Sequence, residues 1–113
     1  MSKRMAEPIL IDIIISTEKI MKYTEGISYE NFCNNSMVID AVIRNFEIIG
    51  EATTKLPDEF KSAHPEIDWF KLRGMRNRLI HDYNRVNFEI IWETIHQEIP
   101  KLKNQIEAIK DKI

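Results

Sequence analysis

Hydrophobic residues recur along the chain at spacings of three and four, and nowhere does a strict alternation of apolar and polar residues persist. This pattern predicts helices rather than strands. One apolar stripe covers residues 9–23 and stops near Gly26, and a second covers residues 39–56. Pro57 either ends the second helix or opens a short extra helical turn that contains Pro65. The first half of the chain therefore predicts two long helices.

The second half of the chain predicts two further helices. The third is expected to begin at Asp68, whose side chain suits an N-cap, and to carry the apolar side chains of Trp69, Leu72, Leu79 and Tyr83. The fourth is expected to run from about Asn87 to the C-terminus, along a continuous seam against its neighbours. That seam consists of Trp92, Ile95, Ile99, Leu102, Ile106, Ile109 and Ile113. Pro100 lies inside the seam without changing its phase, so we expect one helix that is bent where Pro100 frees the carbonyl of His96.

Four main helices with short joins predict an all-α fold, an up-down antiparallel helical bundle with a short extra helical turn. A chain of 113 residues with 43% apolar content suits one core, so residues 1–113 are expected to form a single domain. The N-terminus has neither the pattern of a signal peptide nor that of a spanning helix, which predicts a cytoplasmic protein without membrane contact. The single cysteine, Cys33, permits no internal disulfide and is expected to be a small buried or half-buried hydrophobic residue.

Positive charge is concentrated in one segment, from Lys71 to Arg85. This segment contains five basic residues and one acid, a local charge of +4 in a chain whose net charge is −2. A concentrated cationic patch attracts phosphate, while the acidic remainder keeps the rest of the surface from binding it. The pattern therefore predicts a local anion site, and the basic side chains expected to bind RNA there are Lys71, Arg73, Arg78 and Arg85.

Arg76 and His81, within this basic segment, suit the cleavage of RNA without a metal. Histidine can move the proton of the 2′-hydroxyl near neutral pH, and arginine can stabilise charge on the phosphorane-like transition state. On an unbroken helix His81 would point about 140° away from Arg76, so the two converge with Tyr83 only if the helix ends or loosens near His81. The alternative is structural: a solvated Arg76, a His81 that interacts with the helix dipole, and a Tyr83 in the core.

Arg76, four intervening residues, His81, one residue and Tyr83 spell an Arg-x4-His-x-Tyr signature. The chain thereby resembles the HEPN family, in its HepT-like branch of ribonuclease toxins, and the resemblance extends to Asn77 and to residues 44–52. It implies a metal-independent endoribonuclease that builds its active site across a homodimer. It also implies a type VII-like toxin-antitoxin pair, in which a minimal nucleotidyltransferase antitoxin inhibits the toxin by adenylylation of Tyr83.

Other side chains are expected to support Arg76 and His81. Asn77 and Tyr83 follow from the signature, whereas Glu47 and Glu51 stand on the polar face of the second helix. Either carboxylate could orient Arg76 from that helix. They could equally form a solvated ion-pair ladder with Arg44 and Lys55, and both interpretations stay open. Gly50 lies between the two carboxylates and predicts close approach by another helix.

Competing functions remain open at this point. The main alternative is a non-catalytic HEPN module that binds a nucleotide or docks a nucleotidyltransferase, and a purely structural helical dimer comes third. The His81-Asp82 pair also resembles metal-dependent HD phosphohydrolases, but His64 and His96 lack the flanking aspartates and the spacing of a metal cluster, so no metal or other cofactor is expected. The aromatic residues of this half are expected to lie mostly in the core, although one exposed ring near His81 could stack on a base. They are Trp69, Phe70, Tyr83, Phe88 and Trp92.

Overall fold

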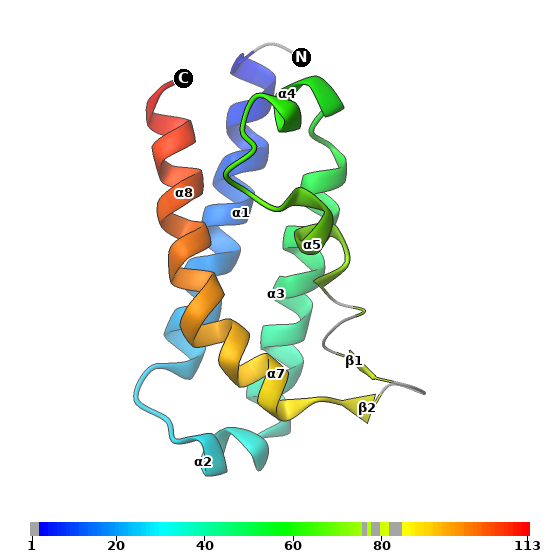
Figure 1. The fold of residues 1–113 in the computed structure, drawn as a ribbon. Coiled ribbons are helices and arrows are strands. Elements are labelled where there is room, and N and C mark those ends of the chain that lie inside the picture. The colour runs from blue at the N-terminus through cyan, green and yellow to red at the C-terminus, as the bar shows by residue number, and fades with distance from the viewer. Residues whose placement is uncertain (1–2, 76, 78–79, 82–84) are drawn as a thin grey trace.

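The computed structural model describes residues 3–75, 77, 80–81 and 85–113. For residues 3–4, 80–81 and 85–86 it describes the backbone without the side chains. All of the long elements are helical, as the sequence predicted, and Figure 1 shows them lying side by side. Within the described residues, no helix is both long enough and apolar enough to cross a membrane.

The first long helix, α1 (Lys3–Thr24), packs against the other two long helical segments of the chain. These are α3 (Ser36–Thr54) and α8 (Ile99–Asp111), and both run in the opposite direction to α1 (Figure 1). A short helix that the sequence did not predict, α2 (Tyr29–Cys33), joins α1 to α3. The core forms where the predicted apolar stripes meet: among its members are Leu10, Ile13, Ile20, Val42, Phe46, Ile49, Ile99 and Ile106, all fully buried. Cys33 is a free, half-buried cysteine, as expected.

The predicted turn after Pro57 is the short helix α4 (Asp58–Ser62), which ends before Pro65 instead of containing it. The predicted third helix begins as expected, because Asp68 caps α5 (Trp69–Arg73) and its Oδ1 accepts a hydrogen bond of 3.0 Å from the Lys71 N–H. The expected extent of that helix, through Leu79 to Tyr83, is wrong. Instead, strand β1 (Ile80–His81) pairs antiparallel with strand β2 (Arg85–Val86), so the helix has ended before Ile80.

The predicted helix is also interrupted at Gly74, where α5 stops. Glycine is a poor helix former, and the Gly74 N–H donates to the carbonyls of Phe70 and Leu72 in the last turn of α5. Met75 and Asn77 are again helical, but the chain enters the β1–β2 pair three residues after Asn77. The apolar spacing of the sequence therefore predicted too long a helix, because it shows neither the break at Gly74 nor the strand pairing that follows.

The last helix begins at Asn87, whose Oδ1 accepts a hydrogen bond of 3.1 Å from the Ile90 N–H, which confirms the predicted start. It is built from α7 (Phe88–Glu93), a π-helical turn η1 (Thr94–Glu98) and α8. The π-helical turn precedes Pro100, which has no N–H to donate to the His96 carbonyl. A widened turn accommodates this loss, and the seam residues Ile95, Ile99 and Leu102 stay buried across it.

Candidate active site

A pocket of about 460 Å³ opens between the second half of α3 and the chain that leaves α5. Its lining consists of Phe46, Glu47, Gly50, Glu51, Thr54, Arg73 and Asn77. Four of these residues are among those expected from the sequence to bind RNA or support catalysis: Glu47, Glu51, Arg73 and Asn77. The structure therefore brings together side chains from two separate segments that the sequence had singled out for different reasons.

Gly50 allows the two walls of this pocket to approach each other. A Cβ atom at this position would lie 3.2 Å from the Leu72 carbonyl oxygen and 3.3 Å from that of Arg73. Both atoms belong to the backbone at the end of α5, so they cannot rotate away as a side chain would. The expectation that another helix approaches Gly50 closely is confirmed.

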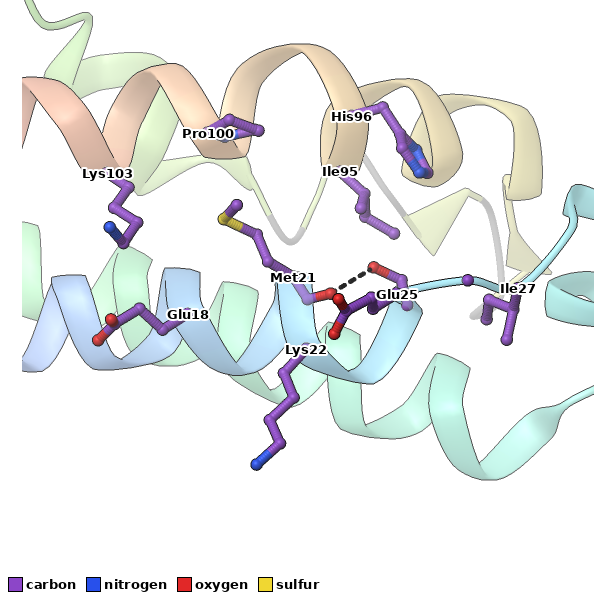
Figure 2. A pocket seen from close by; sticks show the side chains of 11 residues that line it. Glu18, Met21, Lys22, Glu25, Ile27, Ile95, His96, Pro100 and Lys103 are labelled. Atoms are coloured by element: carbon purple, nitrogen blue, oxygen red, sulfur yellow. Dashed lines mark hydrogen bonds between the residues drawn. The ribbon is translucent and has the colours of Figure 1, made fainter.

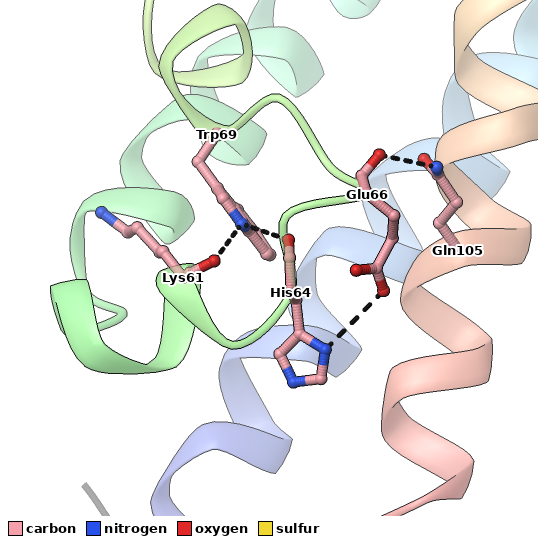
Figure 3. A network of polar contacts seen from close by, with 5 residues as sticks. All are labelled: Lys61, His64, Glu66, Trp69 and Gln105. Atoms are coloured by element: carbon pink, nitrogen blue, oxygen red, sulfur yellow. Dashed lines mark hydrogen bonds and ion pairs between the residues drawn. The ribbon is translucent and has the colours of Figure 1, made fainter.

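The start of α5 is anchored by a network of polar contacts (Figure 3). The Trp69 indole donates hydrogen bonds to the carbonyls of Lys61, at 3.1 Å, and His64, at 3.0 Å. The Gln105 amide of α8 donates a hydrogen bond of 3.1 Å to the Glu66 carbonyl. These bonds tie the α4–α5 connection to the bundle, and they fix the position from which α5 delivers Arg73 to the pocket.

The pocket combines opposite charges. Glu47 forms an ion pair of 3.6 Å with Arg44, one turn earlier on α3, which confirms one contact of the expected ladder. No ion pair joins Glu51 to Lys55 in the described part of the chain. Arg73 and Asn77 are exposed on the opposite wall. Such a set can hold a phosphate through the guanidinium group, and it can orient a hydroxyl or a second cation through the carboxylates.

Lys71 lies apart from this group. It pairs with Glu98 at the end of η1, and it lines a different depression, of about 180 Å³, between α5 and α8. Although Lys71 is only two residues from Arg73, the two cations of α5 therefore serve opposite sides of the helix. The sequence put Lys71 and Arg73 in one basic patch because they are close in the chain. In the structure the rotation along α5 points them to different sides.

The predicted residues Arg76, Arg78 and Tyr83 lie outside the described residues. For His81 and Arg85 the structure describes the backbone, and it pairs these two residues directly across the β1–β2 ladder. The condition set by the sequence, that the helix ends or loosens near His81, is met. His81 therefore need not follow the helical direction that would have turned it about 140° from Arg76.

Sequence reasoning did not assign two contributors to the pocket. Phe46 was counted as a core residue, and it is fully buried, but it also forms part of the pocket lining. Thr54 was not assigned a role. Its hydroxyl donates a hydrogen bond of 2.6 Å to the Glu51 carbonyl, which places its side chain at the pocket edge. The spacing of Thr54, one helical turn after Gly50 and Glu51, is the sequence feature that would have placed it on the same face of α3.

A larger cavity, of about 590 Å³, lies elsewhere, between the end of α1 and the start of α8 (Figure 2). Its lining includes Met21, Ile95, His96 and Pro100 but none of the residues expected to carry chemistry. His96 is held locally: its Nδ1 lies 2.8 Å from the Trp92 carbonyl oxygen. Size alone therefore does not select the site, and the smaller pocket at Gly50 is favoured because it adjoins the Arg-x4-His-x-Tyr segment. Among the described residues, no group of three or more His, Cys, Asp or Glu is arranged to hold a metal ion.

Known proteins and one family model match almost the whole chain. The sequence model of the family described as "Ribonuclease HepT-like" matches residues 13–109. A protein of Caldanaerobacter subterraneus subsp. tengcongensis named "Putative RNase" is 43% identical over 105 residues, which are 93% of this chain and 94% of the relative. The "Probable ribonuclease HepT" of Thermococcus cleftensis is 40% identical over 108 residues, 96% of this chain and 98% of the relative. No solved structure matches the chain significantly.

Proposed function

The chain belongs to the HepT-like ribonuclease family, and we propose that it is a metal-independent endoribonuclease that acts as the toxin of a toxin-antitoxin pair. One structural observation supports this proposal most directly. The pocket beside Gly50 gathers Arg73 and Asn77 on one wall and Glu47 and Glu51 on the other. Asn77 is the residue after Arg76, so the signature segment begins at this pocket.

His81 and Arg76 carry out the reaction in this proposal. His81 accepts the proton of the ribose 2′-hydroxyl, and the 2′-oxygen attacks the adjacent phosphorus. The bond from phosphorus to the 5′-oxygen breaks, and that oxygen takes up a proton from a second acid. The products are a 2′,3′-cyclic phosphate and a 5′-hydroxyl. Arg76 stabilises the charge on the phosphoryl oxygens through its planar fork.

The described lining of the pocket supplies the supporting roles. Glu47 and Glu51 orient Arg76 from α3, as carboxylates commonly hold a catalytic cation, and Asn77 adds amide hydrogen bonds. Arg73, with Arg78 and Arg85, binds RNA phosphates beside the reacting group. We assign Lys71 a smaller part, because its ammonium group is paired with Glu98 on the far side of α5.

A homodimer completes the site. One protomer offers a single histidine in the signature, whereas the mechanism needs both a base and an acid. A two-fold axis that brings both copies of Arg76 and His81 into one cleft supplies the second group. Control is proposed to come from a minimal nucleotidyltransferase antitoxin that adenylylates Tyr83. Each added nucleotide brings a negative charge that would occupy the arginine fork and bulk that would block the cleft.

A cleavage assay with and without chelator tests the proposed activity. Purified protein is incubated with end-labelled single-stranded RNA in excess EDTA, and the ends of the products are identified. We expect the same cleavage with and without EDTA, and 2′,3′-cyclic phosphate ends. Cleavage that requires added metal would contradict the mechanism. Tight RNA or nucleotide binding without cleavage would favour the alternative, a non-catalytic nucleotide-binding module that docks a nucleotidyltransferase.

A further inference from the structure

Phe70 is unusually exposed for a large apolar side chain. It is 86% exposed, more than any other large hydrophobic residue in the described part of the chain. Its neighbours on α5, Trp69 and Leu72, are buried in the core. Leaving a phenyl ring in water forgoes the stabilisation that its burial would provide, so Phe70 contributes little to the fold of the isolated protomer.

The exposed side of α5 carries a charged residue next to Phe70. Arg73 follows it by one turn on the exposed side of α5 and lines the pocket beside Gly50. Among the described residues from 38 to 77, no other large hydrophobic side chain is exposed. Hot spots of protein interfaces lie within a surrounding patch that excludes water, and among the described residues of α5 no second exposed apolar side chain accompanies Phe70. A flat exposed ring one helical turn from the exposed guanidinium group of Arg73 instead suits a single-stranded nucleotide, whose base can stack while its phosphate pairs with the guanidinium.

The other described aromatic side chains of this half, apart from the half-buried Phe88, are engaged elsewhere. Trp69 donates its indole N–H to two backbone carbonyls and packs near Phe60, with ring centroids 6.4 Å apart. Trp92 packs against Phe32, with ring centroids 5.2 Å apart, and it lies in α7, the first segment of the last helix. Phe70 is therefore the candidate, among the described residues, for the exposed ring that the sequence left unidentified.

We propose that Phe70 is a substrate-binding residue that stacks on a base of single-stranded RNA beside the cleavage pocket. The proposal rests on the proposed ribonuclease function and adds a base contact to it. Stacking on an aromatic ring is available to every base, so this contact strengthens binding of unpaired RNA without selecting a sequence. It would also favour unpaired over duplex RNA, because the bases of a helix are stacked on one another.

Binding measurements in a non-cleaving background test this role. The His81→Ala protein is the parent, and Phe70→Ala, Phe70→Trp or the control Met37→Ala is added to it. Each protein is titrated into labelled single-stranded RNA, and binding is followed by fluorescence anisotropy. Met37 is also highly exposed, at 78%, but lies in the first turn of α3, away from the pocket. A second RNA of the same length, with abasic sites, separates stacking from phosphate binding. We expect Phe70→Ala to weaken binding of intact RNA by about five- to 100-fold. Phe70→Trp and Met37→Ala should bind like the parent.

The abasic RNA and the state of assembly decide between explanations. On abasic RNA, Phe70→Ala and the parent should bind equally well. Equal losses on both RNAs, or unchanged binding of intact RNA, would overturn the proposal. A Phe70→Ala protein that sediments as a monomer when the parent is a dimer would make Phe70 a dimer contact instead. If the unsubstituted protein binds RNA but does not cleave it, the ribonuclease proposal fails while the stacking result stands. Absence of any RNA binding would overturn both.

Discussion

Gly50 of α3 lies directly against the backbone of Arg73 at the end of α5. A Cβ atom built on Gly50 would stand 3.3 Å from the Arg73 carbonyl oxygen, tighter than an ordinary contact. The pocket between α3 and the signature segment opens at this contact, with Glu47 and Glu51 on one side and Asn77 on the other. The missing side chain of Gly50 therefore helps to set the distance between the carboxylates and the segment proposed to cleave RNA.

Gly50→Ala is expected to reduce cleavage while the protein stays folded. The new methyl group must push the end of α5 outward by a few tenths of an ångström, which misplaces the segment that follows. Alanine also favours helix α3 by about 1 kcal/mol, and this gain offsets part of the packing cost. We expect cleavage to fall about tenfold or more, since small misplacements of catalytic groups are costly.

Circular dichroism melting measures the stability of Gly50→Ala, and single-turnover cleavage measures its activity. Asp40→Ala, at an exposed position of the same helix, serves as the control. Unchanged cleavage by Gly50→Ala would mean that this contact does not position the site.

His81→Ala and Arg76→Ala are each expected to remove most of the cleavage activity. Loss of a positioned acid or base typically slows a reaction by about 10²- to 10⁴-fold. Initial rates on a single RNA substrate, in EDTA, provide the measurement. His96→Ala is the matched control, because His96 is exposed and lies in η1 outside the proposed site. A His81→Ala protein that cleaves at the parent rate would show that another group moves the proton.

A homodimer of twice 13.4 kDa is expected at micromolar concentration. Sedimentation equilibrium gives the mass. Disulfide trapping then tests the arrangement: Asn77→Cys, in a Cys33→Ala background, should cross-link across the shared cleft. Met37→Cys in the same background serves as the comparison, because Met37 is exposed at the distant start of α3. A monomer, or a dimer in which Asn77→Cys does not cross-link at all, would argue against a composite site.

Tyr83→Phe is expected to fold and to escape modification by the antitoxin. The substitution keeps the ring and removes the hydroxyl oxygen that would accept the adenylyl group. Intact-mass spectrometry after co-expression with the cognate nucleotidyltransferase provides the readout, and the unsubstituted chain should gain adenylyl-sized increments. Tyr23→Phe is the control, because Tyr23 is a partly exposed tyrosine of α1, far from the signature in sequence. Adenylylation that persists in Tyr83→Phe would place the modification on another residue.

Local chemistry explains which parts of the fold could be predicted. Asp68 and Asn87 were expected at helix starts, and both cap helices there. This could be predicted because a cap is local: the side-chain oxygen accepts a hydrogen bond from a free N–H only three residues later. The π-helical turn before Pro100 follows from a missing N–H in the same local way. The end of the third helix was misplaced, because the cap at Gly74 and the pairing of His81 with Arg85 interrupt an apolar pattern that would otherwise continue.

The sequence by itself determined the all-α character of the chain, the buried face of each long helix, and the signature that joins Arg76, His81 and Tyr83. Only the tertiary structure decided which polar faces meet. It placed Glu51 opposite Arg73, turned Lys71 away to Glu98, and left Phe70 in solvent. The physical reason is that helical periodicity specifies the direction of a side chain relative to its own axis. The partner it meets depends on how two helices dock, and here that depends on the close contact that Gly50 permits.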